Sequence, residues 1–258
     1  MYAEERQNAL ADLIGRDRRV SVSSAAETFG VTTETVRRDL ALLERQGLVH
    51  RVHGGAVPAD ALTRLEPAMA ERDVTAAAQK DAIAVAAVDL LPRRGGSIVL
   101  DGGTTTGRLA ALLPASHELT VITNAAPIAA IVASRDDAAQ IALHILGGRV
   151  RPVSQVSVGA AALTSLADLR ADISFIGVNA FDTTRGLFTP DPDEAAVKSA
   201  MIASGRRVVV LADSRKFQLE SMVRFGRLEQ IDAVVTDSGI GDDDLARLET
   251  LDIDVVIA

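Results

Sequence analysis

The chain has 258 residues, 48% hydrophobic and 24% charged, which is enough for one large or two modest globular domains. It has no cysteine, and its four histidines lack metal-ligand spacing, so disulfides, thiolate catalysis, a metal and a cofactor are not expected. Its apolar runs are far shorter than the ~20 residues of a membrane span, and no signal peptide is visible, so we expect a cytoplasmic protein without membrane contacts.

The formal charge of −8 is unevenly distributed along the chain. Residues 1–57 contain eight arginines and eight acidic residues, whereas residues 58–258 contain 19 basic and 27 acidic residues. An acidic body repels polyanions, so any contact with nucleic acid belongs to the N-terminal segment. We therefore predict a DNA-binding domain over 1–57, a linker over 58–77 and a second domain over 78–258.

The first 57 residues predict three helices and a β-wing. Apolar residues form one stripe over 3–15, which indicates an amphipathic helix. Ser24 and Glu27 have the spacing of a capping box, and Gly30 is a natural end for that second helix. A third helix is expected to begin after Thr32, so that only a short turn separates two helices, as in a helix-turn-helix. The alternation in "LVHRVHGGAV" then predicts a small β-wing.

The third helix has a core face and an exposed face. At about 100° per residue, Val36, Leu40 and Leu43 share one face, and Arg38 lies almost opposite them. An exposed arginine can bind guanine or phosphate through two parallel hydrogen bonds. A solvated ion pair between Glu34 and Arg38 is the alternative, and it would be favoured for an isolated arginine pair. The surrounding capped helices and wing favour DNA recognition by Thr33, Thr35, Arg37 and Arg38.

The segment "VSVSSAAETFGVTTETVRRDLALLERQGLVHRVHGGAV" resembles the winged helix-turn-helix of the DeoR family of bacterial transcription regulators. The resemblance implies that the helix over 32–40 enters the major groove of double-stranded operator DNA, with the wing over 51–55 near the backbone or the minor groove. It also implies that Asp39 orients an arginine or caps within the domain. The DNA-binding residues implied are Thr32, Thr33, Thr35, Arg37, Arg38, Arg51, His53 and Gly54.

From Lys80 onward, Val/Ile/Leu-rich strands alternate with helices, which predicts an α/β domain with a mostly parallel sheet. Ligands of such sheets bind at the carboxyl ends of the strands. The expected elements are helices over 80–91, 105–113, 125–134 and 192–204, and strands over 97–100, 119–123, 141–146, 172–178, 207–212, 232–236 and in the terminal "DIDVVIA".

Three of these strand ends carry small polar residues or glycines. The first reads "LDGGTTTG", with a helix starting in the threonines; the second ends at Thr123 and Asn124, and the third at "GG" over 147–148. A helix N-terminus favours an anion through its free N–H groups and its dipole. An ordinary turn with threonine caps is the alternative reading of the first end. Three such ends together favour a phosphate site.

The chain contains only three lysines, Lys80, Lys198 and Lys216, among its 27 basic residues. A chain that otherwise uses arginine can retain lysine where a compact ammonium is required. Glu194 and Lys198 are spaced i,i+4, and Lys216 follows Asp213 near a strand end. The alternatives are a surface ion pair for Glu194 and Lys198 and a loop charge for Lys216. The placement of these residues near strand ends favours a binding site.

Residues 75–237 resemble the DeoR-family sensor domain, through "LDGGTTT", "VITN", "LGG", "EAAVKSAM" and "ADSRKF". The resemblance implies a fold similar to ribose-5-phosphate isomerase, used as a receptor for a phosphorylated sugar effector. Because helix-turn-helix proteins read paired half-sites, a homo-oligomer, dimer or tetramer, is also expected. The implied pocket residues are Asp101, Gly103, Thr104, Thr105, Thr106, Thr123, Asn124, Gly148, Glu194, Lys198 and Lys216.

We therefore expect a ligand-responsive transcription regulator, most often a repressor in this family, and not an enzyme. The first alternative is a sugar-phosphate isomerase or deaminase with an accessory head, in which Glu194, Lys198 and Asp101 would transfer a proton beside a carbonyl. Against it, the Asp-Gly-Ala-Asp run of the isomerase is absent, and "IGVNAFD" stands near its place. The second alternative is an architectural DNA-binding protein whose body serves only for oligomerisation.

Overall fold

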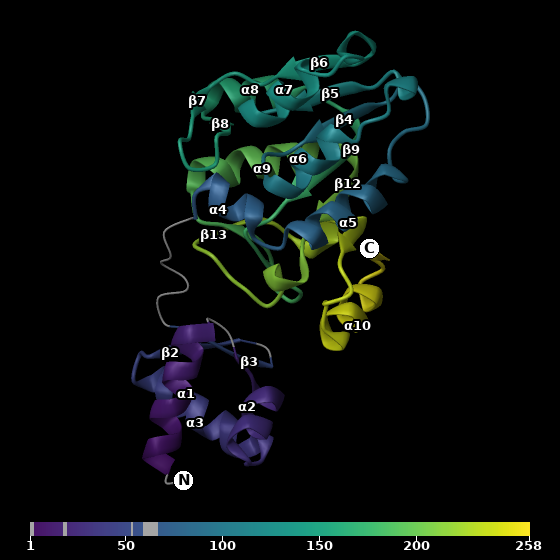
Figure 1. Cartoon of the computed structure of the whole chain (residues 1–258). Coiled ribbons are helices and arrows are strands. Elements are labelled where there is room, and N and C mark those ends of the chain that lie inside the picture. The colour runs from purple at the N-terminus through teal and green to yellow at the C-terminus, as the bar shows by residue number, and fades with distance from the viewer. Residues whose placement is uncertain (1–2, 18–19, 53, 59–66) are drawn as a thin grey trace. The chain divides into compact units, whose positions relative to one another are not determined.

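The computed structural model describes residues 3–17, 20–52, 54–58 and 67–258 (Figure 1). The chain divides into two compact units, Met1–Leu65 and Glu66–Ala258, called here the N-terminal and C-terminal units. Each has a hydrophobic core of its own. Among the described residues, no helix is long and apolar enough to cross a membrane.

The N-terminal unit packs three helices against a small antiparallel sheet. Leu10 and Ile14 of the first helix meet Val36, Leu40 and Leu43 of the third in one core. The strands lie in the order β1-β3-β2, so the β2–β3 hairpin forms the predicted wing. The elements are α1 (Ala3–Asp17), β1 (Val20–Ser21), α2 (Val22–Phe29), α3 (Thr33–Arg45), β2 (Val49–Val52) and β3 (Gly55–Pro58).

The helix ends of this unit agree with two of the three sequence signals. Gly30 ends α2 in the left-handed conformation, with φ 62°, and Thr32 caps α3 by accepting a hydrogen bond from the Thr35 N–H at 3.2 Å. The capping box at Ser24 is wrong, because Ser21 is the N-cap and its Oγ accepts from the Ser24 N–H at 3.0 Å. The chain leaves β1 at Ser21, so α2 begins earlier than Ser24 allows.

The C-terminal unit is built on a seven-stranded sheet, β15-β14-β12-β9-β4-β5-β6, in which all neighbouring strands are parallel. The labels β6, β5, β4, β9 and β12 follow one another down the view in Figure 1. This confirms the predicted parallel α/β sheet. The strands are β4 (Ser97–Leu100), β5 (Thr120–Thr123), β6 (Ala142–Ile145), β9 (Ala171–Gly177), β12 (Gly205–Leu211), β14 (Ala233–Thr236) and β15 (Asp254–Ile257).

Seven helices and five further strands complete the described part of this unit. The β7–β8 pair and the β10-β11-β13 sheet are antiparallel. Sequence reasoning missed α4, α8, α10 and all five of these strands. The elements are α4 (Met69–Val74), α5 (Ala77–Val88), α6 (Thr104–Ala111), α7 (Ala126–Ala133), α8 (Ala160–Ala167), α9 (Pro192–Ser204), α10 (Asp242–Thr250), β7 (Arg149–Val150), β8 (Ser157–Val158), β10 (Ala180–Asp182), β11 (Gly186–Thr189) and β13 (Val223–Gly226), with 3₁₀ turns at η2 (Ala115–His117), η3 (Ala138–Gln140), η4 (Ser214–Lys216) and η5 (Leu228–Gln230).

The strand order reverses direction between β4 and β9. From β4 the chain adds β5 and then β6 on one side, whereas β9, β12, β14 and β15 extend the sheet on the other side. Because parallel crossovers are right-handed, such a reversal sends the connecting helices to opposite faces and leaves a crevice between the strands where it occurs. The carboxyl ends of β4, β9 and β12 therefore border one crevice.

Candidate functional site

A cleft opens where the sheet reverses direction, and we refer to it below as the cleft. It is lined by residues 103–106 after β4, 177–179 after β9 and 211–213 after β12, together with Arg72, Lys80, Lys198 and Lys216. Its space is about 400 Å³, part of it open to solvent. Three neighbouring strand ends thus meet at the position where ligands bind in open parallel sheets.

All three lysines of the chain line this cleft. Lys80, on α5, is 3% exposed, and its Nζ donates a hydrogen bond to the main-chain carbonyl of Arg72. Burial lowers the pKa of Lys80 to about 8, against the attraction of the Asp213 carboxylate, while the charge of Lys216 lowers this pKa further. A buried ammonium that titrates near pH 8 is a group that gains from a bound anion.

The N-terminus of α6 faces the same cleft with its first turn open. Its N-cap is Gly103, which has no side chain to cap the first N–H groups, whereas Asp191 caps α9 by accepting from the Glu194 N–H at 2.9 Å. Uncapped N–H groups and the helix dipole both favour an anion there. The preceding Gly102 is packed so closely that a Cβ would lie 2.1 Å from Val156 Cγ1. The loop therefore requires glycine for packing.

Two buried carboxylates, Asp213 in the lining of the cleft and Asp101 next to Lys198, each retain one unsatisfied oxygen. Among the described residues, Asp213 Oδ2 and Asp101 Oδ1 are buried without a hydrogen-bond partner. The other oxygen of Asp101 accepts from Lys198 Nζ and, at 3.0 Å, from the Gly177 N–H. Burial raises the pKa of the Asp101 carboxyl, while the charge of Lys198 acts in the opposite direction. Buried acceptors without partners are rare in proteins, and a ligand donor such as a hydroxyl would satisfy them.

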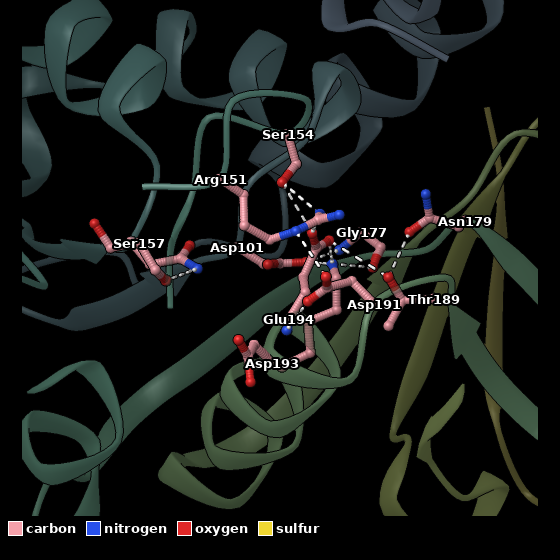
Figure 2. Close-up of polar contacts among 12 residues, drawn as sticks. Asp101, Arg151, Ser154, Ser157, Gly177, Asn179, Thr189, Asp191, Asp193 and Glu194 are labelled. Atoms are coloured by element: carbon pink, nitrogen blue, oxygen red, sulfur yellow. Dashed lines mark hydrogen bonds and ion pairs between the residues drawn. The ribbon is translucent and has the colours of Figure 1, made fainter. Parts of the chain in front are cut away.

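Glu194 organises a polar network beside the cleft (Figure 2). Its carboxylate pairs with Arg151 and accepts from Ser154 Oγ at 2.9 Å, and it lies 3.8 Å from Lys198 Nζ. Thr189 Oγ1 lies 3.1 Å from Asn179 Oδ1 and 3.5 Å from Glu194. The network thus connects the cleft to the segment between β7 and β8, which contains Arg151 and Ser154.

The structure brings six of the eleven predicted pocket residues to the lining of the cleft: Gly103, Thr104, Thr105, Thr106, Lys198 and Lys216. Asp101 is buried and reaches the cleft through Lys198, and Glu194 lies in the network just described. Of the described residues, Thr123, Asn124 and Gly148 do not contribute to the lining. They lie at the ends of β5 and β6, which the sheet order places beyond β4, away from β9 and β12.

The two strand ends away from the cleft have packing contacts of their own. Thr123 Oγ1 accepts from the Ala125 N–H at 3.1 Å, and Asn124 Nδ2 donates to the Ser157 carbonyl at 3.2 Å. Gly148 has φ 144°, and a Cβ there would lie 2.6 Å from the Val158 carbonyl oxygen. These contacts hold the β7–β8 hairpin against the end of β5.

Sequence reasoning missed several residues that line the cleft. Arg72 lies in the segment predicted as a linker. Lys80 is one of the three lysines of the chain, but it is not among the pocket residues predicted from the sequence. Asn179 and Asp213 follow strands that were predicted, and the rule of strand ends could have singled them out. Nothing in the sequence pointed to Arg72, because α4 has neither a side-chain cap nor a buried residue to mark it.

In the N-terminal unit, α3 exposes the predicted arginines. The side chain of Arg38 is 80% exposed and that of Arg37 is 58% exposed, and they lie 3.4 and 3.9 Å from the Glu34 carboxylate. Such exposed ion pairs are weak, so DNA phosphates can compete for both arginines. Thr33 is exposed, and the Thr32 and Thr35 hydroxyls lie 2.9 Å apart at the start of the helix.

Asp39, in contrast, is turned toward the interior of the unit. Its carboxylate accepts from Arg6 Nε at 2.7 Å and from Gln7 Nε2 at 2.8 Å, which joins α3 to α1. The expectation that Asp39 orients an arginine within the domain is confirmed.

The wing carries the remaining predicted DNA contacts. The main-chain N–H of Arg51 donates to Glu44 Oε1 at 2.9 Å, and its exposed guanidinium lies 4.0 Å from the same carboxylate. Gly54, exposed at the turn, has φ 74°, and its carbonyl accepts from the Val22 N–H at 2.7 Å. His53 lies outside the described residues.

A helix-turn-helix unit followed by a parallel α/β unit with a cationic cleft is the organisation of a ligand-responsive DNA-binding protein. Comparison with protein families agrees with this organisation. Residues 6–61 match the DeoR-like helix-turn-helix domain, and residues 75–238 match the DeoR C terminal sensor domain.

Curated relatives extend the similarity over nearly the whole chain. The putative aga operon transcriptional repressor of Escherichia coli O157:H7 is 33% identical, over 98% of this chain and 93% of its own length. The HTH-type transcriptional regulator GlpR of Haloferax volcanii is 33% identical over 99% and 98%, and the glycerol-3-phosphate regulon repressor of Escherichia coli K12 is 30% identical over 92% of each chain. The chain therefore belongs to the DeoR family: it is a DNA-binding transcriptional regulator with a sensor domain, and not an enzyme.

Among solved structures, ribose 5-phosphate isomerase A of Methanocaldococcus jannaschii aligns with 54% of this chain and 53% of its own. The identity is 18% and the TM-score is 0.38. At this level the similarity adds nothing to the strand order described above.

Proposed function

We propose that this regulator is a repressor of genes for sugar or polyol metabolism, and that a phosphorylated sugar or polyol bound in the cleft controls its affinity for operator DNA. The observation that carries the proposal is the convergence of all three lysines on the open N-terminus of α6. Two relatives are named as repressors of an aga operon and of a glycerol-3-phosphate regulon, which supports the repressor role.

The charges of the cleft support a phosphate ester over a neutral sugar. Lys80 and Lys216 present two ammonium groups, and the first turn of α6 presents backbone N–H donors. A phosphate dianion accepts several charge-assisted hydrogen bonds from such a set. The low pKa of Lys80 supports the same ligand, because a bound dianion would offset the loss of water on burial, which lowers this pKa most, and the repulsion from Lys216.

The unsatisfied carboxylate oxygens support an ester that carries hydroxyl groups over inorganic phosphate. Asp213 Oδ2 and Asp101 Oδ1 are acceptors without partners in the described part of the chain. Asp213 lines the cleft, so a ligand hydroxyl can donate to it, whereas Asp101 contacts the cleft through Lys198. A second phosphate or a carboxylate on the ligand would meet these two carboxylates with repulsion. We therefore place a phosphomonoester with free hydroxyls in the cleft.

The DNA side of the proposal rests on α3 and the wing. Exposed Arg37 and Arg38, with Thr33, are proposed to enter the major groove, and Arg51 with Gly54 to meet the adjacent backbone. We propose a DNA-binding domain over 1–57 and a linker that begins at 58; of the linker predicted over 58–77, the part from Glu66 onward belongs to the C-terminal unit. Since helix-turn-helix proteins bind paired half-sites, a homo-oligomer is proposed as the operator-binding form.

A ligand screen followed by a DNA-binding assay tests the proposal. Thermal shift is measured with glycerol 3-phosphate, fructose 1-phosphate, glucose 6-phosphate, ribose 5-phosphate and inorganic phosphate. An ester at 100 times its dissociation constant should stabilise the protein by about 2.7 kcal/mol, and inorganic phosphate by less at equal concentration. Each ester that stabilises the protein is then added to an operator selected by the protein from a random duplex library, at fixed salt.

Variants separate the cleft from general effects of charge. Lys216→Met should abolish the stabilisation by the ester and leave operator affinity unchanged. Arg207→Met, which removes an exposed charge paired with Asp254 away from the cleft, should change neither. Absence of any stabilising ester, or esters that bind without altering operator affinity, would refute the proposal.

A further inference from the structure

Arg108 of α6 binds the short helix α4 through several hydrogen bonds. Its guanidinium donates from Nη1 to Asp73 Oδ1 at 2.6 Å and from Nη2 to the Asp73 carbonyl at 3.0 Å. The same guanidinium donates from Nε to Asp81 Oδ1, on α5, at 2.6 Å. With its side chain 18% exposed, Arg108 is held in one geometry by these partners.

Two hydrogen bonds connect α4 and Arg108 to the residues of the cleft. Arg108 Nη1 also donates to the carbonyl of Thr104, the first residue of α6, at 3.1 Å. Lys80, which lines the cleft, donates to the carbonyl of Arg72, next to Asp73 in α4. Figure 1 shows α4 beside α6 in the C-terminal unit. Two carbonyls near the end of α4 are thus held by cations that touch the cleft or the helix that opens into it.

An anion in the cleft would compete directly with one of these bonds. The Lys80 ammonium has a carbonyl partner now, and a phosphate on the first turn of α6 would be a stronger acceptor for it. Recruitment of Lys80 by phosphate would remove its bond to the Arg72 carbonyl and leave the bonds from Arg108 to Asp73 in place. The docking of α4 thus depends on whether the cleft is occupied.

α4 lies in the chain between the DNA-binding wing and the cleft, so its docking bears on how the two domains are coupled. α4 is the first helix of the C-terminal unit, and the DNA-binding wing ends with β3 at Pro58. α4 therefore stands, along the chain, between the DNA-binding domain and the helices that line the cleft. An element with two docked arrangements that both sites bias is what energetic coupling requires.

We infer that Arg108 is a positioning residue for the regulatory response: through its bond to Asp73 it makes α4 the element by which occupancy of the cleft changes operator affinity. The inference rests on the proposed function, because it assigns a route to the coupling proposed there. It predicts that the route can be cut while both binding sites remain intact.

Asp73 and Asp81 provide a matched pair of variants for the test. Each accepts from the same guanidinium at 2.6 Å, and their side chains are 57% and 64% exposed, but Asp73 belongs to α4 and Asp81 to α5. Asp73→Asn weakens the bond to α4, and Asp81→Asn makes the same chemical change on α5. Arg108→Met removes all four hydrogen bonds of the guanidinium, to Asp73, Asp81 and the Thr104 carbonyl.

The measured quantity is the coupling ratio, the operator dissociation constant with saturating ester divided by that without it. The ester is the member of the five-compound screen with the largest thermal shift, and its own affinity is measured by calorimetry. For the wild type we expect a ratio that departs from 1 by about 5- to 150-fold. Asp73→Asn and Arg108→Met should bring the ratio toward 1 with ester affinity changed less than about threefold, and Asp81→Asn should keep the wild-type ratio.

The possible outcomes separate the inference from the proposed function. Wild-type coupling in Asp73→Asn, or equal loss in Asp73→Asn and Asp81→Asn, overturns the role of α4 and leaves the proposed function standing. A wild-type ratio of 1 with tight ester binding overturns the proposed function itself, and the inference with it. Loss confined to Asp73→Asn and Arg108→Met supports both.

Discussion

Lys80 is a cation from which the fold has removed most water. Its pKa of about 8, below the ordinary 10.5, means that the free protein loses this charge as the pH rises through 8. Between pH 8 and 10.5 the unfolded chain binds a proton at this lysine that the folded chain does not. For this group alone, the free energy of unfolding therefore rises with pH over that window.

Ligand affinity should show the opposite trend. A phosphate ester is a dianion above about pH 6, so its charge is constant from pH 7 to 9.5. Because the ester prefers the charged lysine, its affinity should be level up to about pH 7 and fall above pH 8, by at most about tenfold per pH unit. Calorimetry across this range, in buffers of different ionisation enthalpy, should also detect proton uptake on binding near pH 8.

Lys80→Met supplies the control for this pH dependence. The variant should bind the ester more weakly, and its affinity should stay level up to pH 9.5. An unchanged fall above pH 8 in Lys80→Met would assign the titration to another group.

Arg38 is the residue on which we expect operator recognition to depend most. It points away from the core formed by Val36, Leu40 and Leu43, and it is more exposed than Arg37. Arg38→Ala should weaken operator binding by about 1–3 kcal/mol and relax the preference at one base pair, because a bidentate contact to guanine is lost. Binding of the ester should not change. Fluorescence anisotropy with single-base operator variants measures both effects.

Arg45, at the other end of the same helix, is a control of equal charge. Arg45→Ala should leave the base preference unchanged. Equal, sequence-independent losses in both variants would mean that Arg38 contacts only phosphate.

At the scale of elements, the contacts of Asp39 join α1 to α3 in the N-terminal unit. Asp39 accepts from Arg6 and Gln7, and its side chain is 6% exposed. Asp39→Ala leaves the mostly buried Arg6 guanidinium without its carboxylate, so the domain should lose about 3–5 kcal/mol of unfolding free energy. Chemical denaturation followed by circular dichroism measures the loss. Glu34→Ala, which removes an exposed acid from the same helix, should cost less than about 1 kcal/mol.

The same joint shows what local sequence can predict. Periodicity identified the core face of α3, and the turn residues Gly30 and Thr32 marked its start, because caps and faces depend on neighbouring residues. The cap of α2 was misplaced because β1 pairs with β3, more than 30 residues away along the chain. Pairing partners at such a distance leave no local signal.

In the candidate site, too, the sequence predicts the parts that depend on neighbouring residues and misses those that depend on contacts distant in the chain. The loop after β4 was identified because a helix N-terminus and its glycines are adjacent in sequence. Which strand ends meet that loop depends on the order of the sheet, and here the order brings β9 and β12 to it and keeps β5 and β6 beyond β4. The segment that contains α4 is predicted as linker, because the contact that attaches α4 joins Asp73 to Arg108, 35 residues further along the chain. Long-range ion pairs of this kind cannot be read from spacing.

At the scale of the whole molecule, two separate hydrophobic cores predict two unfolding transitions. A saturating phosphate ester should raise the midpoint of the sensor transition, because it binds that unit alone. Operator DNA should raise the other midpoint. Differential scanning calorimetry with each ligand separately resolves the two effects.

A single transition that both ligands shift equally would contradict this expectation and would show that the two units unfold cooperatively. Asp39→Ala should lower only the transition that operator DNA raises. The transition that Asp39→Ala lowers is that of the DNA-binding domain, so this variant assigns the two transitions without the use of ligands.

The confinement of lysine to one cleft also affects the chemical reactivity of the protein. A reagent selective for lysine side chains has three targets in 258 residues, and each of them borders the same cleft. An amine with a pKa of about 8 is partly neutral, and therefore nucleophilic, near physiological pH. Acylation of these lysines should thus modify the proposed effector site selectively and leave the arginines of α3 unmodified, so that we expect the response to the effector to be lost before the affinity for DNA.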